Sequence, residues 1–151
     1  MMKKHWIVLA ALMISFVAVS SARGLCVKSS RANLRTGPGM KHKVAWQVYM
    51  YMPLERIGRS TNKYWYAVRD ADGDTFWVHK GLVTDSYRCA VVNVEKANVR
   101  KGPGKKYSTV EDSPAQKYYS YKVISRKKNW IKVRDEWGAV GWIRKDLLWI
   151  R

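Results

Sequence analysis

The chain has 151 residues, a length that ordinarily corresponds to one domain. Its 29 Lys and Arg residues outnumber its 11 Asp and Glu residues, and the formal net charge is +18 at pH 7. This surplus favours contact with nucleic acid, anionic lipid or a cell-wall polymer. A solvated basic surface accounts for it equally well, because the cations are spread along the chain. Gly and Pro occur at turns rather than in tracts, which excludes a low-complexity chain.

Residues 1–22 are predicted to be a signal peptide. Lys3 and Lys4 form a positive n-region, and Trp6–Val19 is an apolar segment too short for a comfortable membrane span. Small residues precede a cleavage point after Ala22. An uncleaved anchor is the alternative. We therefore expect an exported protein, periplasmic or otherwise extracytoplasmic, with no stable membrane span after cleavage.

The segment after the signal reads as short strands separated by turns. The expected strands cover Leu25–Lys28, Ala32–Arg35, Val44–Met52, Leu54–Ile57, Trp65–Arg69 and Thr75–Val78, with Pro53 marking an edge or turn. Gly37-Pro38-Gly39 predicts a turn, because proline fixes φ and the flanking glycines can adopt positive φ. The Asp-Gly pair within Asp70–Asp74 predicts a hairpin, and Lys80–Leu82 one helical turn. This pattern indicates a small all-β barrel.

The same unit occurs twice. The pattern Ala32–Gly39 returns as Ala97–Gly104, 65 positions later. Further pairs keep this offset: Trp65 with Trp130, Val68 with Val133, Trp77 with Trp142, Lys80 with Lys145, and Leu82 with Leu147. A motif and two tryptophans in one register indicate a duplication. We therefore expect two barrels, over residues 24–88 and 89–151.

The second unit repeats the later elements of the first and differs in its middle. Asn129–Arg134 and Ala139–Ile143 are expected to be strands, with a turn between them. Ser113–Tyr121 replaces Tyr49–Ile57, and its tyrosines at positions 118, 119 and 121 are expected to take over the aromatic role.

Two cysteines flank the first unit. Export favours a disulfide, and Cys26 precedes the first motif while Cys89 follows the end of the unit. If the unit brings its ends together, as small barrels do, a bridge would close it with about 4 kcal/mol of loop-closure entropy. Two free thiols or an intermolecular bridge are the alternatives.

These motifs resemble the bacterial SH3 (SH3b) domain family, whose signature is Ala-Asn-Val-Arg-x-Gly-Pro, then Trp-x-x-Val, then Gly-Trp-Val. The matching segments are Ala32–Pro38, Trp65–Val68 and Phe76–Val78 in the first unit, and Ala97–Pro103, Trp130–Val133 and Gly141–Ile143 in the second. The sequence departs from the family at Phe76 and in the middle of the second unit. The resemblance implies two tandem five-stranded, partly open barrels that bind rather than catalyse. Several exported members dock peptidoglycan peptides or cross-bridges.

The residues argue against an enzyme and a metal site. A cysteine hydrolase needs a thiol beside a histidine, whereas only His42 and His79 follow the signal and both cysteines are expected to be bridged. Zinc ligands in a recognised spacing are missing. Asp70, Asp72 and Asp74 alternate as cation ligands would, but a hairpin turn accounts for them better. We expect no catalytic residues, no metal and no cofactor.

Strand alternation suggests where a ligand would bind. If Ile131 and Val133 face the core, then Trp130 and its counterpart Trp65 lean toward solvent, while Tyr66 and Val68 point inward. An exposed tryptophan is a ligand platform, and partial burial under the preceding turn is the alternative. By resemblance to SH3 folds, the outer side of the later strand also borders the groove. The candidate ligand-binding residues are Trp65, Trp77, His79, Trp130, Trp142 and Arg144.

The polar part of the repeated motif is expected to fix its long loop by hydrogen bonds. The residues concerned are Asn33, Arg35, Gly37 and Pro38, and Asn98, Arg100, Gly102 and Pro103.

Three functional hypotheses follow. The favoured one is a non-catalytic module that binds cell-wall peptides through one or both aromatic grooves, with avidity from the linked sites. The second is a scaffold that binds another envelope protein, its barrels packed together because Cys89 and Ala90 leave almost no linker. The third is salt-sensitive, charge-driven binding to an anionic envelope polymer. No specific nucleic-acid partner is expected.

Overall fold

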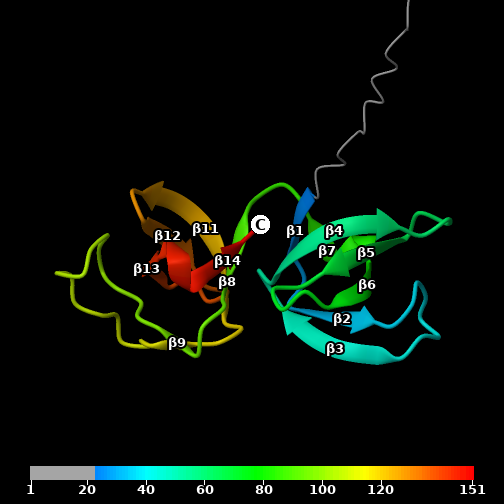
Figure 1. Cartoon of the computed structure of the whole chain (residues 1–151), viewed down its shortest axis with the longest axis horizontal. Helices are drawn as coiled ribbons and strands as arrows, with labels where there is room; N and C mark the ends of the chain where they lie inside the picture. The colour runs from blue at the N-terminus through cyan, green and yellow to red at the C-terminus, as the bar shows by residue number, and fades with distance from the viewer. Residues whose placement is uncertain (1–22) are drawn as a thin grey trace, which may run out of the picture.

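A computed structural model describes residues 23–151 (Figure 1), and the predicted signal peptide lies outside these described residues. The described chain is almost entirely β-structure, arranged as two small barrels. The predicted all-β pair of barrels is therefore confirmed. Between residues 23 and 151, no helix has the length and apolar character needed to cross a bilayer.

The first barrel contains seven short strands and one 3-10 turn. In chain order these are β1 (Arg23–Val27), β2 (Arg31–Arg35), β3 (Val44–Tyr49), β4 (Pro53–Arg59), β5 (Trp65–Arg69), β6 (Thr75–His79), η1 (Lys80–Leu82) and β7 (Val83–Thr84). They form an antiparallel sheet in the order β3-β2-β6-β5-β4-β1-β7. The strands β2 to β6 make the expected barrel, and β1 and β7 extend one edge of the sheet. Pro53 begins β4 rather than separating two strands.

The second barrel repeats this topology. Its elements are β8 (Cys89–Val92), β9 (Lys96–Ala97), β10 (Ala115–Gln116), β11 (Ser120–Lys127), β12 (Trp130–Arg134), β13 (Val140–Arg144), η2 (Lys145–Leu147) and β14 (Leu148–Ile150). The order β13-β12-β11-β8-β14 matches β6-β5-β4-β1-β7 of the first barrel. The short pair β9 and β10 stands in the place of β2 and β3.

The middle of the two units, which differs most in sequence, keeps one backbone feature. Tyr51 and Tyr118 both adopt positive φ, at 68° and 69°. Their backbone N–H groups donate to the carbonyls of Val27 and Val92, which are 65 positions apart. The two tyrosines are 67 positions apart, so the second unit holds two extra residues before this point. The insertion explains why direct sequence matching fails there.

Each barrel has its own apolar core. Ile131 and Val133 are buried in the second core, and Val68 is buried in the first, as strand alternation predicted. Tyr66 is half-buried and packs against the first core. Among the tyrosines of the second unit, only Tyr121 is a fully buried core residue.

The strand β8 contributes side chains to both cores. All four of its residues are buried. Ala90 and Val92 pack into the second core, whereas Val91, which points the other way, belongs to the first. Trp149 of β14 pairs with Val91 and also packs against the first core. The barrels are therefore joined by buried apolar surface and not only by the chain.

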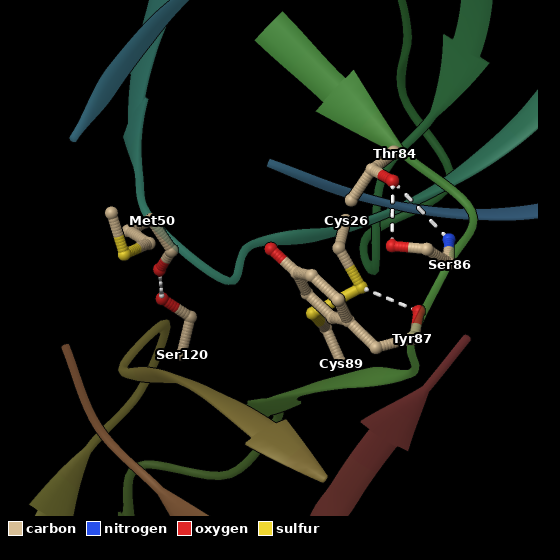
Figure 2. The surroundings of a disulfide bond; sticks show 7 residues. All are labelled: Cys26, Met50, Thr84, Ser86, Tyr87, Cys89 and Ser120. Carbon is tan, nitrogen blue, oxygen red and sulfur yellow. Dashed lines mark hydrogen bonds between the residues drawn. A yellow bond between two sulfur atoms is a disulfide. The ribbon is translucent and has the colours of Figure 1, made fainter. Parts of the chain in front are cut away.

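The disulfide crosses this junction (Figure 2). Cys26 lies on β1 of the first barrel and Cys89 on β8 of the second, with their Cα atoms 5.7 Å apart. The predicted pair is bonded, and the bridge links the two ends of the first unit as expected, although Cys89 also begins the second barrel. It ties the first strand of one barrel to the first strand of the other, because β8 contributes to both cores. Nearby, Ser120 Oγ donates a 2.8 Å hydrogen bond to the Met50 carbonyl across the same junction.

Candidate functional site

The two barrels carry equivalent grooves. The first groove, of about 170 Å³, is lined by Arg31, Asn33, Arg35, Met40, Gln47, Trp65, His79 and Leu82. The second groove, of about 200 Å³, is lined by Lys96, Asn98, Arg100, Lys105, Trp130, Arg144 and Leu147. Every lining residue of the second groove lies 65 positions after a lining residue of the first. The duplication has therefore preserved a surface feature as well as a fold.

Strand register brings the groove residues together. Trp65 on β5 lies opposite His79 on β6, and Trp130 on β12 lies opposite Arg144 on β13. The Trp65 and His79 rings meet edge to face, with centroids 5.4 Å apart. Four of the six predicted ligand-binding residues thus line the grooves, together with the asparagine and arginine of each repeated motif.

The tryptophans do not project as the alternation argument predicted. Trp65 is only 6% exposed, so its predicted lean toward solvent is wrong, and Trp130 is half-buried. Both faces of β5 are covered at this point, because the core lies on one side and the groove walls on the other. Each tryptophan is consequently the floor of a groove rather than an open platform.

Trp77 and Trp142 are half-buried and line neither equivalent groove. They pair with Ala67 and Lys132, two residues further along the same strands. The Lys132 ammonium lies 6.0 Å from the Trp142 ring centroid. The structure therefore separates these two predicted site residues from the grooves.

The repeated motif shapes the loop that forms one groove wall. Arg35 Nη1 donates to the carbonyls of Met40 and His42, at 3.1 and 2.8 Å. In the second barrel, Arg100 Nη1 donates to the Tyr107 carbonyl at 2.8 Å. These bonds hold the loop segment that carries Met40 or Lys105 against the groove.

The glycines of the motif are required for space and not for positive φ. In residues 23–151, the glycines with positive φ are Gly73 and Gly138, in the hairpin turns. A Cβ at Gly37 would lie 2.5 Å from the His42 ring, and one at Gly102 would overlap the Tyr107 ring. The loop closes over these glycines, so the expectation of positive φ at Gly37 and Gly39 is corrected.

The two grooves differ in the residue at one end, which is His79 in the first groove and Arg144 in the second. His79 Nδ1 accepts a 3.1 Å hydrogen bond from the Gly81 backbone N–H, capping η1. Its counterpart Arg144 instead pairs with Asp146, with Nε 2.6 Å from Oδ1. The hydrogen bond from Arg144 lowers the pKa of Asp146, and the same bond raises the pKa of Arg144.

The sequence did not predict a larger groove that lies at the junction of the two barrels. This junction groove, of about 750 Å³, is lined by Ser30, Arg31, Tyr49, Met50, Tyr118, Tyr119, Ser120, Glu136 and Trp137. Trp137 is 75% exposed on a hairpin in which Asp135 accepts the N–H groups of Trp137 and Ala139. One signal was available: Trp137 occupies the repeat position of Asp72, and an aromatic residue is unusual in a polar turn.

A fourth hollow, of about 400 Å³, opens into the second barrel beside Tyr119, Tyr121 and Gly141. Phe76, the counterpart of Gly141, packs against the first core and lies 6.4 Å from the Trp46 ring. A Cβ at Gly141 would overlap the Val99 side chain, so the second barrel has no room at this position for a counterpart of the Phe76 side chain. Burial raises the pKa of Tyr119 to about 12.

In the part of the chain from residue 23 onward, no group of three or more His, Cys, Asp or Glu side chains is placed to hold a metal ion. Asp70 Oδ1 accepts the backbone N–H groups of Asp72 and Asp74, at 3.0 and 2.8 Å. The alternating aspartates thus make the hairpin turn that the Asp-Gly pair predicted.

Comparison with known proteins gives one family match. The family described as bacterial SH3 domain matches residues 28–85 and 93–149. A search of curated proteins found no match.

Among solved structures, NlpC2 from Trichomonas vaginalis has a TM-score of 0.36 at 13% identity, covering 84% of this chain and 48% of that one. NlpC1 from the same organism has a TM-score of 0.35 at 15% identity, covering 91% and 50%. An NlpC/P60 family protein from Bacillus cereus ATCC 10987 has a TM-score of 0.39 at 12% identity, covering 85% and 56%. The chain spans about half the length of these structures.

Proposed function

Because the chain belongs to the bacterial SH3 domain family, we propose that it is a non-catalytic, exported binding protein whose equivalent grooves recognise peptides of the cell wall. The observation that carries this proposal is that every lining position of the second groove repeats a lining position of the first at the 65-position offset. The middle of the second unit has changed its length and composition, whereas the groove positions keep their tryptophan, asparagine and arginine.

The groove chemistry suits a peptide. A tryptophan floor offers apolar contact, and the flanking asparagine and arginine offer donors and acceptors to a peptide backbone. Each groove is small, so it would hold one or two residues of a ligand. Two such sites on one chain gain avidity on a repetitive polymer. The disulfide between Cys26 and Cys89 supports an oxidising, extracytoplasmic compartment.

The test is co-sedimentation of the mature protein with purified peptidoglycan sacculi at low and high salt. The informative variants are Asn98→Ala and Trp130→Phe in the second groove and Asn33→Ala in the first, because they change groove contacts while leaving the floor largely filled. Trp65→Ala is avoided, since it would empty a buried site. Trp137→Ala is the matched control, because it removes an exposed tryptophan outside both equivalent grooves.

We expect binding that persists at high salt, weakens several-fold in each single variant, and weakens much further in Asn33→Ala with Asn98→Ala. Binding that disappears at high salt and ignores these substitutions would leave only charge-driven attachment to an anionic polymer. The absence of binding at either salt concentration would reject the cell-wall proposal.

The junction groove favours a second candidate function, the binding of another envelope protein. Tyr49, Tyr118 and Trp137 are all exposed there, and aromatic side chains are enriched at protein interfaces. Cross-linking in intact envelopes, with a photoreactive residue in place of Trp137, tests this candidate. A specific partner cross-linked there but not from Tyr64, an exposed tyrosine away from the groove, would favour the scaffold function.

A further inference from the structure

The two equivalent grooves differ in charge, and from this difference we infer that the second groove binds carboxylate groups of the wall peptide more strongly than the first groove does. This inference rests on the proposed peptide-binding function. It assigns different ligand chemistry to two sites that the sequence repeat alone would treat as copies.

The charge difference comes from two of the aligned positions. Met40 in the first groove becomes Lys105 in the second, and His79 becomes Arg144. The other two cationic positions are cationic in both grooves, as Arg31 or Lys96 and as Arg35 or Arg100. The substitutions at the groove wall thus add positive charge only to the second barrel.

Part of this charge is free to meet a ligand. Lys96 and Lys105 are exposed, and neither forms a salt bridge among the described residues. Arg100 donates from Nη1 to the Tyr107 carbonyl, and its other N–H groups are available to a ligand. The positive charge of Arg144 is balanced by the carboxylate of Asp146, and the residue equivalent to Asp146 in the first barrel is Gly81. The lysines and Arg100 therefore carry the net charge of the second groove.

The groove geometry favours a carboxylate on a peptide over a phosphate polymer. The cations surround a half-buried tryptophan in a groove of about 200 Å³, which is room for one small anionic group with an apolar neighbour. A long polyanion would instead contact the basic residues that are spread over both barrels.

The repeat itself supplies the variants for the test. Lys105→Met places the first-barrel residue in the second groove, and Met40→Lys does the reverse. The matched controls are Lys101→Thr and Thr36→Lys, an exposed repeat pair on the same loops that lines neither groove. Each control changes the total charge of the protein by the same amount as the variant it accompanies.

The probes are purified sacculi, the same sacculi after carbodiimide-coupled amidation of their carboxylates, and sacculi stripped of phosphodiester-linked polymers. The measured quantity is the ratio of affinities for unmodified and amidated sacculi. We expect the wild-type protein to prefer unmodified sacculi. Lys105→Met should reduce that affinity ratio about fivefold, and Met40→Lys should raise it by a similar factor. These factors correspond to one ion pair between a lysine and a ligand carboxylate, worth about 1 kcal/mol. Both controls should retain the wild-type ratio.

Equal effects of Lys105→Met and Lys101→Thr would overturn the inference, because charge would then act without regard to the groove. A preference that disappears on stripping the phosphodiester polymers would overturn it in favour of phosphate. Wild-type binding with no preference for unmodified sacculi would overturn it and leave the proposed function intact. No binding to any sacculi would remove the proposed function and the inference with it.

Discussion

The Tyr118 hydroxyl of the second barrel donates a 2.7 Å hydrogen bond to Asp72 Oδ2, at the tip of a hairpin in the first barrel. The Tyr118 ring also meets Trp46 of the first barrel edge to face, at a centroid distance of 5.6 Å. In the repeat, Asp72 corresponds to Trp137. One hairpin therefore fastens the barrels together, and its counterpart presents an aromatic side chain to the junction groove.

This contact predicts coupling between Tyr118 and Asp72. The hydrogen bond to Asp72 raises the pKa of Tyr118 above its ordinary value. We expect Asp72→Asn to lower that pKa, measured by the pH dependence of the Tyr118 ring resonances. Asp72→Asn and Tyr118→Phe should also destabilise less together than the sum of the single substitutions. Strict additivity in urea denaturation would contradict the contact.

The disulfide should contribute to the stability of the whole pair of barrels. It closes a loop with a sequence separation of 63 residues. Replacing both cysteines with alanine is expected to lower the free energy of unfolding by about 4 kcal/mol, chiefly because the unfolded chain gains freedom. Urea denaturation with and without reductant measures this loss. Reductant should not affect the double variant, and a loss below about 1 kcal/mol would refute the estimate.

The close approach at Gly37 predicts contrasting effects of two neighbouring substitutions. Gly37→Ala places a methyl group 2.5 Å from the His42 ring, whereas Gly39→Ala places one at an ordinary 3.5 Å contact. We expect Gly37→Ala to cost about 1–3 kcal/mol of stability and Gly39→Ala to be nearly neutral. Adding His42→Ala should recover much of the loss at Gly37. Equal destabilisation by both glycine substitutions would show that conformation matters more than space.

The raised pKa of Tyr119 predicts that the free energy of unfolding falls at alkaline pH. Burial raises its pKa from the ordinary 10.0 to about 12, with a smaller contribution from the charge of Asp135. The fold favours the neutral phenol, so this contribution is fully present below about pH 10 and is lost as the pH rises toward 12. Tyr119→Phe should make the free energy of unfolding fall less steeply over that interval, in urea titrations at successive pH values. An unchanged slope would mean that Tyr119 has the same pKa in the folded and the unfolded protein.

The sequence determined the duplication, the all-β barrels, most strand positions and the two hairpin turns. These features are encoded locally, because alternation, proline, glycine and Asp-Gly act on neighbouring residues and a repeat shows them twice. The pairing of Trp65 with His79 and of Trp130 with Arg144 follows from the hairpin between their strands, whereas their role in binding a ligand stays a prediction.

Only the tertiary structure decided what covers each side chain. Trp65 is buried although its strand position alternates outward, because the motif loop and η1 overlie that face. Cys26 and Cys89 join two barrels because β8 lies between two cores, which no periodicity in the sequence encodes. The junction groove likewise exists only where two barrels meet. Burial and docking depend on contacts between residues distant in the chain, and local patterns do not specify such contacts.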